Sequence, residues 1–301
     1  MYSTFEQIEA AILASGIKKV VALAGAHDSY ALDAVLEATR NNLIEAVLIG
    51  HEVEIRSLLE KGGEDPAKFQ IIDCDDDKEM TKIAVRLIHE GKADIPMKGL
   101  LQTSDYMRPI LDKEAGLLQP GGLISQATLF EFEQEGRFFL LGDCAINIAP
   151  DTEHKKQIIK NTIALMHKLG IEQPKIACLS AVEIVNPKIP STVQADELKR
   201  ACAAGEFGNA IVAGPLAFDN AISSVAAEHK GINDPVAGRA DFLLCPDLCT
   251  GNALTKAISF FSNMKSAGVL LGTSAPLISA SRTDTPENKY RAILLGLLLS
   301  L

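Results

Sequence analysis

The chain has 301 residues, of which 47% are hydrophobic, so it can bury a sizeable core and is expected to form two domains. Its formal net charge is −10 at pH 7, and lysine and arginine are dispersed without a basic stripe, which argues against a nucleic-acid partner. No apolar run reaches the ~20 residues that span a bilayer, and the first residues lack the pattern of a signal peptide. We therefore expect a cytoplasmic protein with no membrane partner.

Cysteine and histidine spacing argues against a metal site. The six cysteines lie mostly in apolar surroundings, as expected of reduced thiols rather than of a disulfide framework. Cys245 and Cys249 have the wrong spacing for a zinc knuckle, and the histidines form no HxxxH or HExxH pair. The chain also lacks a P-loop and a GxGxxG fingerprint, so we expect neither a metal nor a nicotinamide cofactor.

Apolar strand-like runs alternate with helical patterns along the chain. The runs cover residues 18–23, 46–49, 69–72, 138–141, 175–179, 210–213, 242–245 and 268–271. The first three runs precede helical patterns at 28–41, 52–61 and 77–91. This alternation predicts an α/β fold with a parallel sheet covered by helices on both faces. Turn formers at Gln119-Pro-Gly-Gly122 mark a domain boundary, and the final helix could return to the first domain.

Polar residues that directly follow the strand-like runs are candidate site residues, because ligands of open α/β sheets bind beyond the carboxyl ends of the strands. These residues are Lys98, Gly99, Thr103, Ser104, Arg108, Asn147, Gly214, Asp219 and Asn220. Each of them alone is also explained by turn chemistry, and Lys98 by the role of a solvated or capping lysine.

A second candidate segment lies near the end of the chain. Ser281 and Arg282 follow a buried strand-like run and stand just ahead of a helix whose start is marked by Asp284 or Thr285 and by Pro286. A helix N-terminus offers unpaired N–H groups and a partial positive charge, so a hydroxyl and an arginine placed there can bind phosphate. The alternative is that these residues only cap the last helix.

Together, these motifs resemble those of the phosphate acetyl/butyryltransferase family, and specifically its butyryl branch, over nearly the full length. The resemblance rests on Met97-Lys98-Gly99, Met107-Arg108-Pro109, Asp143 to Pro150, Asn186 to Val193, Gly214 to Ala221, Pro246-Asp247, Gly251-Asn252, Lys256 and Ser281-Arg282. It implies a reversible reaction in which acyl-CoA and phosphate give acyl phosphate and free CoA.

The resemblance also implies a fold and an assembly. The family has two α/β domains with a cleft between them, similar to isocitrate and isopropylmalate dehydrogenases, and is usually dimeric. On that pattern, residues 1–124 with 280–301 would form the first domain and residues 125–279 the second. The substrates would be acyl-CoA, acyl phosphate and phosphate, the protein would be a homodimer, and an acyl kinase would be its pathway partner.

Family roles can be carried over where the motifs match. Arg282 resembles the arginine that binds phosphate or the phosphorylated substrate, and Ser281 resembles the serine that steadies the transition state. Arg108 resembles a second phosphate-binding arginine. Lys98 is a further candidate ligand for an anion.

The sequence identifies the general base less directly. The acetyl enzymes place an aspartate seven residues after the serine, where this chain has Asn288. We take Asp284 as the candidate base, with Glu287 behind it, although both are also explained as acids favoured by the helix dipole. A cysteine nucleophile, Cys144 or Cys245, is the other possibility, but it would need a neighbouring base or cation that the sequence does not place there.

The Lys98-Gly99 and Gly214-Pro-Leu signatures resemble the butyryl branch, so we expect butyryl-CoA and phosphate to give butyryl phosphate and CoA by direct attack in a ternary complex. Phosphate acetyltransferase is the first alternative. A non-catalytic acyl-CoA-binding regulatory module is the second, although the presence of Ser281 and Arg282 favours an enzyme. A metal-dependent dehydrogenase on the same fold would need an aspartate cluster and an NAD(P) site.

Overall fold

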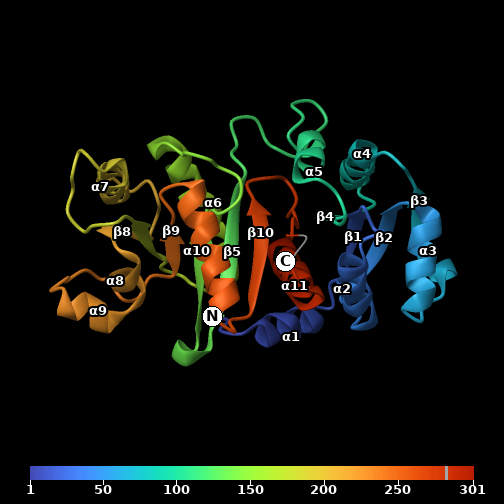
Figure 1. Ribbon diagram of the computed structural model, residues 1–301, viewed down its shortest axis with the longest axis horizontal. Helices are drawn as coiled ribbons and strands as arrows, with labels where there is room; N and C mark the ends of the chain where they lie inside the picture. The colour runs from blue at the N-terminus through green and yellow to red at the C-terminus, as the bar shows by residue number, and fades with distance from the viewer. Residues whose placement is uncertain (282–283) are drawn as a thin grey trace. The chain divides into compact units, whose positions relative to one another are not determined.

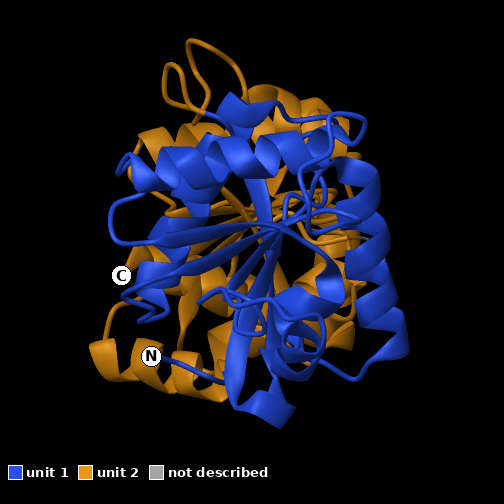
Figure 2. Cartoon of the chain, turned by 90° about the vertical axis from the view of Figure 1, so that its left-hand side faces the viewer, with its two compact units in different colours: residues 1–4, 123–266 blue, residues 5–122, 267–301 orange. Residues whose placement is uncertain are grey.

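The computed structural model of the protein describes residues 1–281 and 284–301. The chain divides into two compact units, shown in Figure 2. Unit 1 comprises Met1–Thr4 and Leu123–Ser266, and unit 2 comprises Phe5–Gly122 and Ala267–Leu301.

The unit boundaries differ from those expected for the domains. The sequence places them after residues 124 and 279, whereas the structure divides the chain after residues 122 and 266. The second boundary falls earlier, and the segment after β10 pairs with unit 2. Isolated bridges join Thr273 to Leu118 and Ile278 to Met97. In the sequence, residues 267–279 have the pattern of a separate strand and loop. That local pattern does not show which unit they join.

Unit 2 contains a parallel four-stranded sheet in the order β3-β2-β1-β4 (Figure 1). Its strands are β1 (Lys19–Ala24), β2 (Ile44–Gly50), β3 (Gln70–Asp73) and β4 (Ile95–Lys98). Its helices are α1 (Phe5–Ser15), α2 (Ser29–Arg40), α3 (Glu52–Lys61), the short η1 (Pro66–Lys68), α4 (Asp77–His89), α5 (Thr103–Ile110) and α11 (Pro286–Ser300). Because crossovers between parallel strands are right-handed, α2 and α3 cover one face and α4 the other.

The helices of unit 2 begin where capping chemistry predicts. Asp28 accepts hydrogen bonds from the backbone N–H groups of Tyr30 and Ala31 and so caps α2. Asp76 caps α4 in the same way. Helix α11 begins with Thr285 as its cap and Pro286 at its first position. Local side chains therefore fix the point at which α2, α4 and α11 begin.

Unit 1 contains strands in the order β5-β6-β9-β7-β8. They are β5 (Ser125–Phe132), β6 (Arg137–Gly142), β7 (Lys175–Leu179), β8 (Ile211–Leu216) and β9 (Phe242–Leu244). The helices are η2 (Glu133–Glu135), α6 (Thr152–Lys168), α7 (Pro190–Ala203), α8 (Phe218–Ile222), α9 (Ser224–His229) and α10 (Leu248–Phe261). Strand β10 (Ser266–Leu271) begins at the last residue of unit 1.

Strand β5 corrects the expectation of a wholly parallel sheet. It pairs antiparallel with β6, with Thr128 opposite Leu141 and Phe130 opposite Phe139. The turn between the two strands ends at Gly136, which adopts the left-handed conformation that glycine tolerates best (φ 60°). The sequence reading recognised β6 but not β5. The stacked rings of Phe130 and Phe139, 5.2 Å apart, lie in the apolar core of unit 1.

Candidate active site

The carboxyl edge of the sheet in unit 2 brings together segments from both ends of the chain. Ile278 extends the sheet beside β4, because its N–H donates to the Pro96 carbonyl (3.1 Å) and its carbonyl accepts from the Lys98 N–H (2.8 Å). This pairing places the segment that leads to Ser281 next to Lys98. Two candidate regions that are far apart in the sequence therefore meet at one edge of the sheet.

Gly99 is required here by the close approach of two chain segments. A Cβ atom at this position would lie 2.2 Å from the carbonyl oxygen of Gly25, in the turn after β1. No side chain fits at that distance. Because Gly99 has no side chain, the backbone directly after Lys98 can pass this close to the turn after β1.

Two hydrogen bonds join Ser281 and Asp284 just ahead of α11. The carboxylate of Asp284 accepts a hydrogen bond from the Ser281 N–H (2.6 Å), and the Asp284 N–H donates to the Ser281 carbonyl (3.1 Å). Burial raises the pKa of Asp284, while the Ser281 N–H and the charges of Lys289 and Lys98 act in the opposite direction. This carboxyl therefore binds a proton more tightly than a free aspartate does.

Lys98 is almost completely buried, with 3% of its surface exposed. Its ammonium donates to the carbonyls of Gly99 (3.3 Å) and Leu101 (3.4 Å). Both contacts are long for hydrogen bonds to a cation. Lys98 thus adds a positive charge to the site and acts electrostatically on Asp284.

Lys289 is a site residue that the sequence reading missed. It lies in α11 with 1% of its surface exposed, and its ammonium donates to the Ser281 carbonyl at 2.9 Å. The ammonium also lies 3.9 Å from the carboxylate of Asp28. The available signal was a lysine in the first turn of a helix, where the helix dipole disfavours a cation.

Thr103, Ser104 and Arg108 all lie on α5 in unit 2 and are exposed. Ser104 and Arg108 are one helical turn apart and share a face. Within the described part of the chain, Arg108 makes no ion pair. Its guanidinium is thus available to an anionic ligand. The other predicted arginine, Arg282, lies outside the described residues.

Asn147, in unit 1, is engaged in the loop after β6. The carboxylate of Asp143 accepts hydrogen bonds from the N–H groups of Ala145 and Ile146, and from the Asn147 side chain at 2.6 Å. The Asn147 amide also donates to the Ile124 carbonyl at 2.9 Å. Both amide hydrogens of Asn147 therefore have partners inside unit 1.

Gly214 also serves a close approach. A Cβ atom at Gly214 would lie 2.8 Å from Cβ of Cys178, and its φ of 149° disfavours other residues. The position therefore lets β8 and β7 approach within one sheet.

Asp219 and Asn220 lie in a polar cluster with Glu183 and Lys230. Asn220 is fully buried and donates to Glu183, while Lys230 contacts the carboxylates of both Glu183 (2.8 Å) and Asp219 (3.0 Å). The Lys230 ammonium lowers the pKa of Asp219. Asn220 Oδ1 is buried without a hydrogen-bond partner, whereas the amide nitrogen is used internally.

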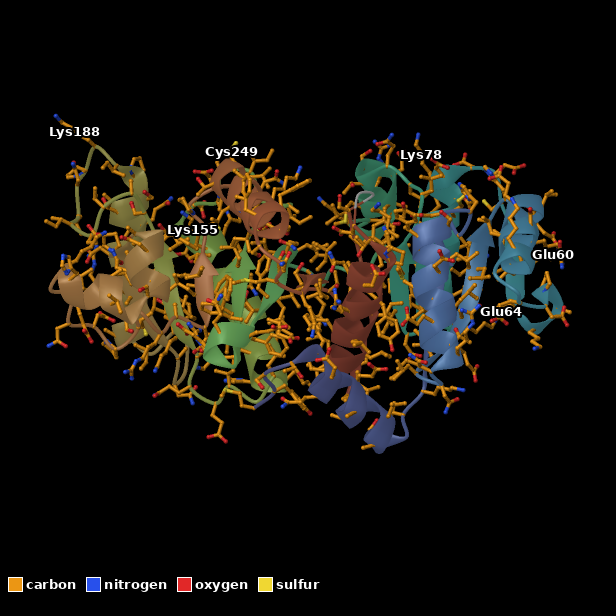
Figure 3. The ribbon with its side chains drawn as sticks, turned by 60° about the horizontal axis from the view of Figure 1, so that its bottom comes forward. Glu60, Glu64, Lys78, Lys155, Lys188 and Cys249 are labelled. Carbon is orange, nitrogen blue, oxygen red and sulfur yellow. The ribbon has the colours of Figure 1, made fainter. Side chains whose placement is uncertain are left out.

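Cys245 and Cys178 lack the environment of a nucleophile. The neighbouring Cys144 and burial raise the pKa of Cys245 well above its usual value. Burial likewise raises the pKa of Cys178 to about 12. A reactive cysteine needs a lowered thiol pKa. The exposed thiol is Cys249, near the start of α10 (Figure 3).

The described residues provide neither a metal-binding cluster nor a membrane-spanning helix. Across residues 1–281 and 284–301, no group of three or more histidine, cysteine, aspartate or glutamate side chains is arranged to hold a metal ion. No helix in these same ranges has both the length and the apolarity to cross a membrane.

One cavity in the described part of the chain lies elsewhere in unit 2. It has a volume of about 550 Å³ and is lined by residues that include Val20, Arg40, Glu45 and Gln70, near the amino ends of the strands. Arg40 is already bonded to Glu64 (2.7 Å). Asp284, Ser281 and Lys98 do not line this cavity.

Comparison with known proteins identifies the family. The model described as "Phosphate acetyl/butaryl transferase" matches residues 3–87 and 78–296. The chain is 39% identical over 300 residues to a phosphate butyryltransferase of Clostridium acetobutylicum, covering 100% of this chain and 99% of the relative. It is 37% identical over 284 residues to a phosphate acetyltransferase of Thermotoga maritima, covering 94% and 96% of the two chains.

A solved structure gives the same result. The crystal structure of a branched-chain phosphotransacylase from Enterococcus faecalis V583 is similar to this chain with a TM-score of 0.83 and 31% sequence identity. The similarity covers 93% of this chain and 98% of the other. The fold, the motifs and these relatives agree, and the chain belongs to the phosphate acetyl/butyryltransferase family.

Proposed function

We propose that this protein catalyses the reversible transfer of a short acyl group between CoA and phosphate, with butyryl-CoA and phosphate giving butyryl phosphate and CoA. The observation that carries the proposed chemistry is the half-buried carboxyl of Asp284, bonded to the Ser281 N–H at 2.6 Å and facing the charges of Lys98 and Lys289. Family membership supports the reaction, and this carboxyl supplies a base for it.

The reaction proceeds by direct attack with both substrates bound. In the direction of CoA acylation, the thiol sulfur attacks the carbonyl carbon of butyryl phosphate, and Asp284 accepts the thiol proton. The new carbon–sulfur bond forms, the carbon–oxygen bond to phosphate breaks, and phosphate leaves with the bonding electrons. Holding the two substrates together lowers the barrier by roughly 7–11 kcal/mol. No covalent enzyme intermediate is required.

The reverse reaction uses the same groups. A phosphate oxygen attacks the thioester carbon, and the departing CoA sulfur takes the proton from the Asp284 carboxyl. A carboxyl with a raised pKa suits both directions, because it is a stronger base when ionised and still releases a proton near neutral pH. The amide of Asn288, four residues further on, offers no such exchange.

Cationic side chains bind the phosphate in this proposal. Arg108, exposed on α5, and Arg282 bind the phosphate oxygens, while Lys98 contributes positive charge beside Asp284. Ser281 stabilises the negative charge that develops on the carbonyl oxygen. Gly99, Thr103 and Ser104 shape the substrate side of unit 2. We assign Asn147, Gly214, Asp219 and Asn220 to shaping the substrate side of unit 1.

The acyl group is four carbons long or branched in this proposal. The identity of 39% to a phosphate butyryltransferase over the whole chain supports a butyryl substrate. One methylene in an apolar pocket is worth roughly 1–3 kcal/mol, so related enzymes readily differ in acyl length. Phosphate acetyltransferase is the second candidate, since an acetyl enzyme is 37% identical. A non-catalytic acyl-CoA-binding module is the third.

The proposal extends to the setting of the enzyme. It uses CoA and phosphate as substrates with no cofactor and no metal, acts in the cytoplasm as a homodimer, and supplies acyl phosphate to an acyl kinase. The two units act as domains, with a fold similar to that of isocitrate and isopropylmalate dehydrogenases. A chain that leaves unit 2 after Gly122 and returns to it at Ala267 supports this discontinuous arrangement.

The test is phosphate-dependent release of free thiol from butyryl-CoA, measured beside acetyl-CoA and isobutyryl-CoA with EDTA present. We expect release to require phosphate and to be faster with the four-carbon substrates. A preference for acetyl-CoA would assign the acetyl reaction. Binding of CoA without turnover of any substrate would contradict an enzyme and favour the binding module.

A further inference from the structure

Lys289 lies at a fully buried position, where lysine is rare unless another group compensates its charge. It is among the largest fully buried side chains, with 1% of its surface exposed, and it lies at the fourth residue of α11. Burial lowers its pKa because the charged form loses its hydration. Removing an ammonium from water costs several kcal/mol unless other groups compensate. A leucine or methionine would fill the same space without that cost.

The contacts of Lys289 join three segments of unit 2. Its ammonium donates to the Ser281 carbonyl at 2.9 Å and lies 3.9 Å from the Asp28 carboxylate. Asp28 uses its other oxygen to cap α2 through the N–H groups of Tyr30 and Ala31. The lysine therefore links the turn after β1 to the loop that precedes its own helix.

Ser281 is consequently held at both backbone polar groups. Its N–H donates to the Asp284 carboxylate, and its carbonyl accepts from the Lys289 ammonium and from the Asp284 N–H. Three hydrogen bonds thus fix the orientation of this one residue, directly before Arg282. A charged donor makes the stronger kind of hydrogen bond, so losing it should loosen the hold on Ser281.

The charged groups around Asp284 come from three elements. Lys289 faces it from α11 and Lys98 from the end of β4, while Asp28, in the turn before α2, faces Lys289. Both lysines favour the ionised form of Asp284, against the effect of burial. Removing one lysine should therefore raise the pKa of Asp284, because less positive charge would oppose the effect of burial.

We propose that Lys289 is a positioning residue of the acyl-transfer site: its buried ammonium holds the Ser281 carbonyl and supplies positive charge that keeps Asp284 ready to accept the thiol proton. This role rests on the proposed function of Ser281 and Asp284. Lys289 itself does not touch the reacting atoms; it acts through these two residues and through Asp28.

The decisive variants are Lys289→Met, which keeps an unbranched side chain one atom shorter and removes its charge, and Lys289→Arg, which keeps the charge. Lys155→Met is the matched control. Lys155, in unit 1, is also buried, with 3% of its surface exposed, and its ammonium donates to the neutral side chain of Gln194. The control measures what the same loss of a buried ammonium does to folding alone.

The first measurement is the pH dependence of butyryl-CoA phosphorolysis. Lys289→Met should lower kcat by about 100-fold, the size expected for misplacing a catalytic group by an ångström. Its acidic limb should move up by about one pH unit, because an opposite charge near Asp284 is lost. The KM for butyryl-CoA should stay within about threefold. In Lys289→Arg the acidic limb should lie at its wild-type pH, and Lys155→Met should not shift the pH of that limb.

The second measurement does not require activity. Carboxyl-carbon NMR of the full-length protein follows the titration of Asp284 directly, with Asp284→Asn used to assign the signal. The pKa of Asp284 should be higher in Lys289→Met than in wild type, and Lys289→Arg should reverse the change. An unchanged Asp284 titration would overturn the inference, as would a loss of activity in Lys289→Met that is matched by Lys155→Met at equal loss of stability.

The two proposals can fail separately. If the wild-type protein releases no thiol with any acyl-CoA, the proposed function is wrong, whereas the NMR titration still decides whether Lys289 controls Asp284. If wild type is active and Lys289→Met has the same kcat and pH profile, the function stands and the role of Lys289 is wrong.

Discussion

At the scale of single residues, the protonation of Asp284 depends on a balance of opposing effects. Burial raises the pKa of Asp284, and the Ser281 N–H, Lys289 and Lys98 oppose that rise. The first effect makes the carboxylate a better proton acceptor, and the second favours its ionised form. The balance depends on side chains that approach from separate parts of the chain.

Replacing Asp284 by asparagine tests its role as the base. Because general-base catalysis contributes about 10²–10⁴-fold, we expect Asp284→Asn to lower kcat by that range and to abolish the acidic limb of the pH profile. The control is Asp33→Asn, the same chemical change at an exposed position of α2. Near-wild-type turnover in Asp284→Asn would contradict the assignment.

The same variant makes a prediction about stability. When the folded pKa of a carboxyl is raised, the folded state binds more protons than the unfolded state between the two pKa values. The contribution of Asp284 to stability is therefore highest at low pH and falls as pH rises through its folded pKa. Asp284→Asn should thus be at least as stable as wild type at pH 8, judged by thermal unfolding at pH 5 and pH 8.

Arg108→Ala tests phosphate binding by α5. The exposed guanidinium makes no ion pair within the described part of the chain, so its removal should leave the thermal midpoint unchanged. Loss of a charged hydrogen bond to phosphate, worth about 1.5–3 kcal/mol, should raise the KM for phosphate roughly 10- to 100-fold. Arg86→Ala, which removes an exposed arginine of α4, is the control. An unaltered KM would remove Arg108 from the site.

At the scale of elements, α11 connects the stability of unit 2 to its site. Its residues from Ala292 to Leu298 are buried, and it packs against α1 and α2. The same helix carries Lys289 and begins directly after Asp284. A helix anchored by so much apolar surface provides a rigid base for the contacts between Ser281 and Asp284.

Leu295→Ala tests that anchoring. Leu295 is fully buried, so its truncation should lower the free energy of unfolding by about 2–5 kcal/mol, measured by urea unfolding followed by circular dichroism. Val53→Ala is the control, because Val53 is 82% exposed on α3 of the same unit and should change stability by less than about 0.5 kcal/mol. Equal effects of the two changes would show that α11 does not anchor unit 2.

The elements also show which parts of the fold are readable from local pattern. Strands β1, β2, β3 and β6 to β10 coincide with apolar runs, since a strand buried on both faces must be apolar throughout. Strand β5 was missed because its run is interrupted by Gln126, Thr128 and Glu131. Thr128 accepts from the Gln126 amide, and Glu131 is paired with Lys265. Hydrogen-bond and ion-pair partners make these polar residues compatible with a strand. One partner, Lys265, is remote in sequence from β5.

At the scale of the whole molecule, the chain carries a net charge of −10 while its proposed substrates are anions. Lys98, Lys289 and Arg108 all belong to unit 2, and the first two act electrostatically on Asp284 in that unit. Because screening makes electrostatic interactions short-ranged in salt solution, these local cations matter more to a bound phosphate than the net charge does.

Metal removal is the prediction for the molecule as a whole. Since the proposed reaction uses lysine, arginine and a carboxyl, we expect full activity after dialysis against EDTA and without any nicotinamide cofactor. The measurement is the thiol-release assay before and after dialysis, with Mg²⁺ added back as the control. A loss of activity that Mg²⁺ restores would contradict this mechanism.

Several properties could be inferred before any coordinates were considered. The α/β class follows from the alternation of apolar runs and helical patterns, and the family follows from short motifs whose order is preserved along the chain. These are local signals, so a linear reading captures them. Lys98 and Asp284 are predicted as site residues for the same reason, since they are polar residues directly after a strand or at a helix start.

The remaining features depend on contacts between distant segments. Tertiary structure placed Ile278 beside β4, the ammonium of Lys289 on the Ser281 carbonyl, and Asp28 next to that ammonium. It also paired β5 with β6 and divided the chain after Ser266. A sequence pattern reports whether a residue is apolar, charged or turn-forming. Which distant group compensates a buried charge is decided only when the chain has folded.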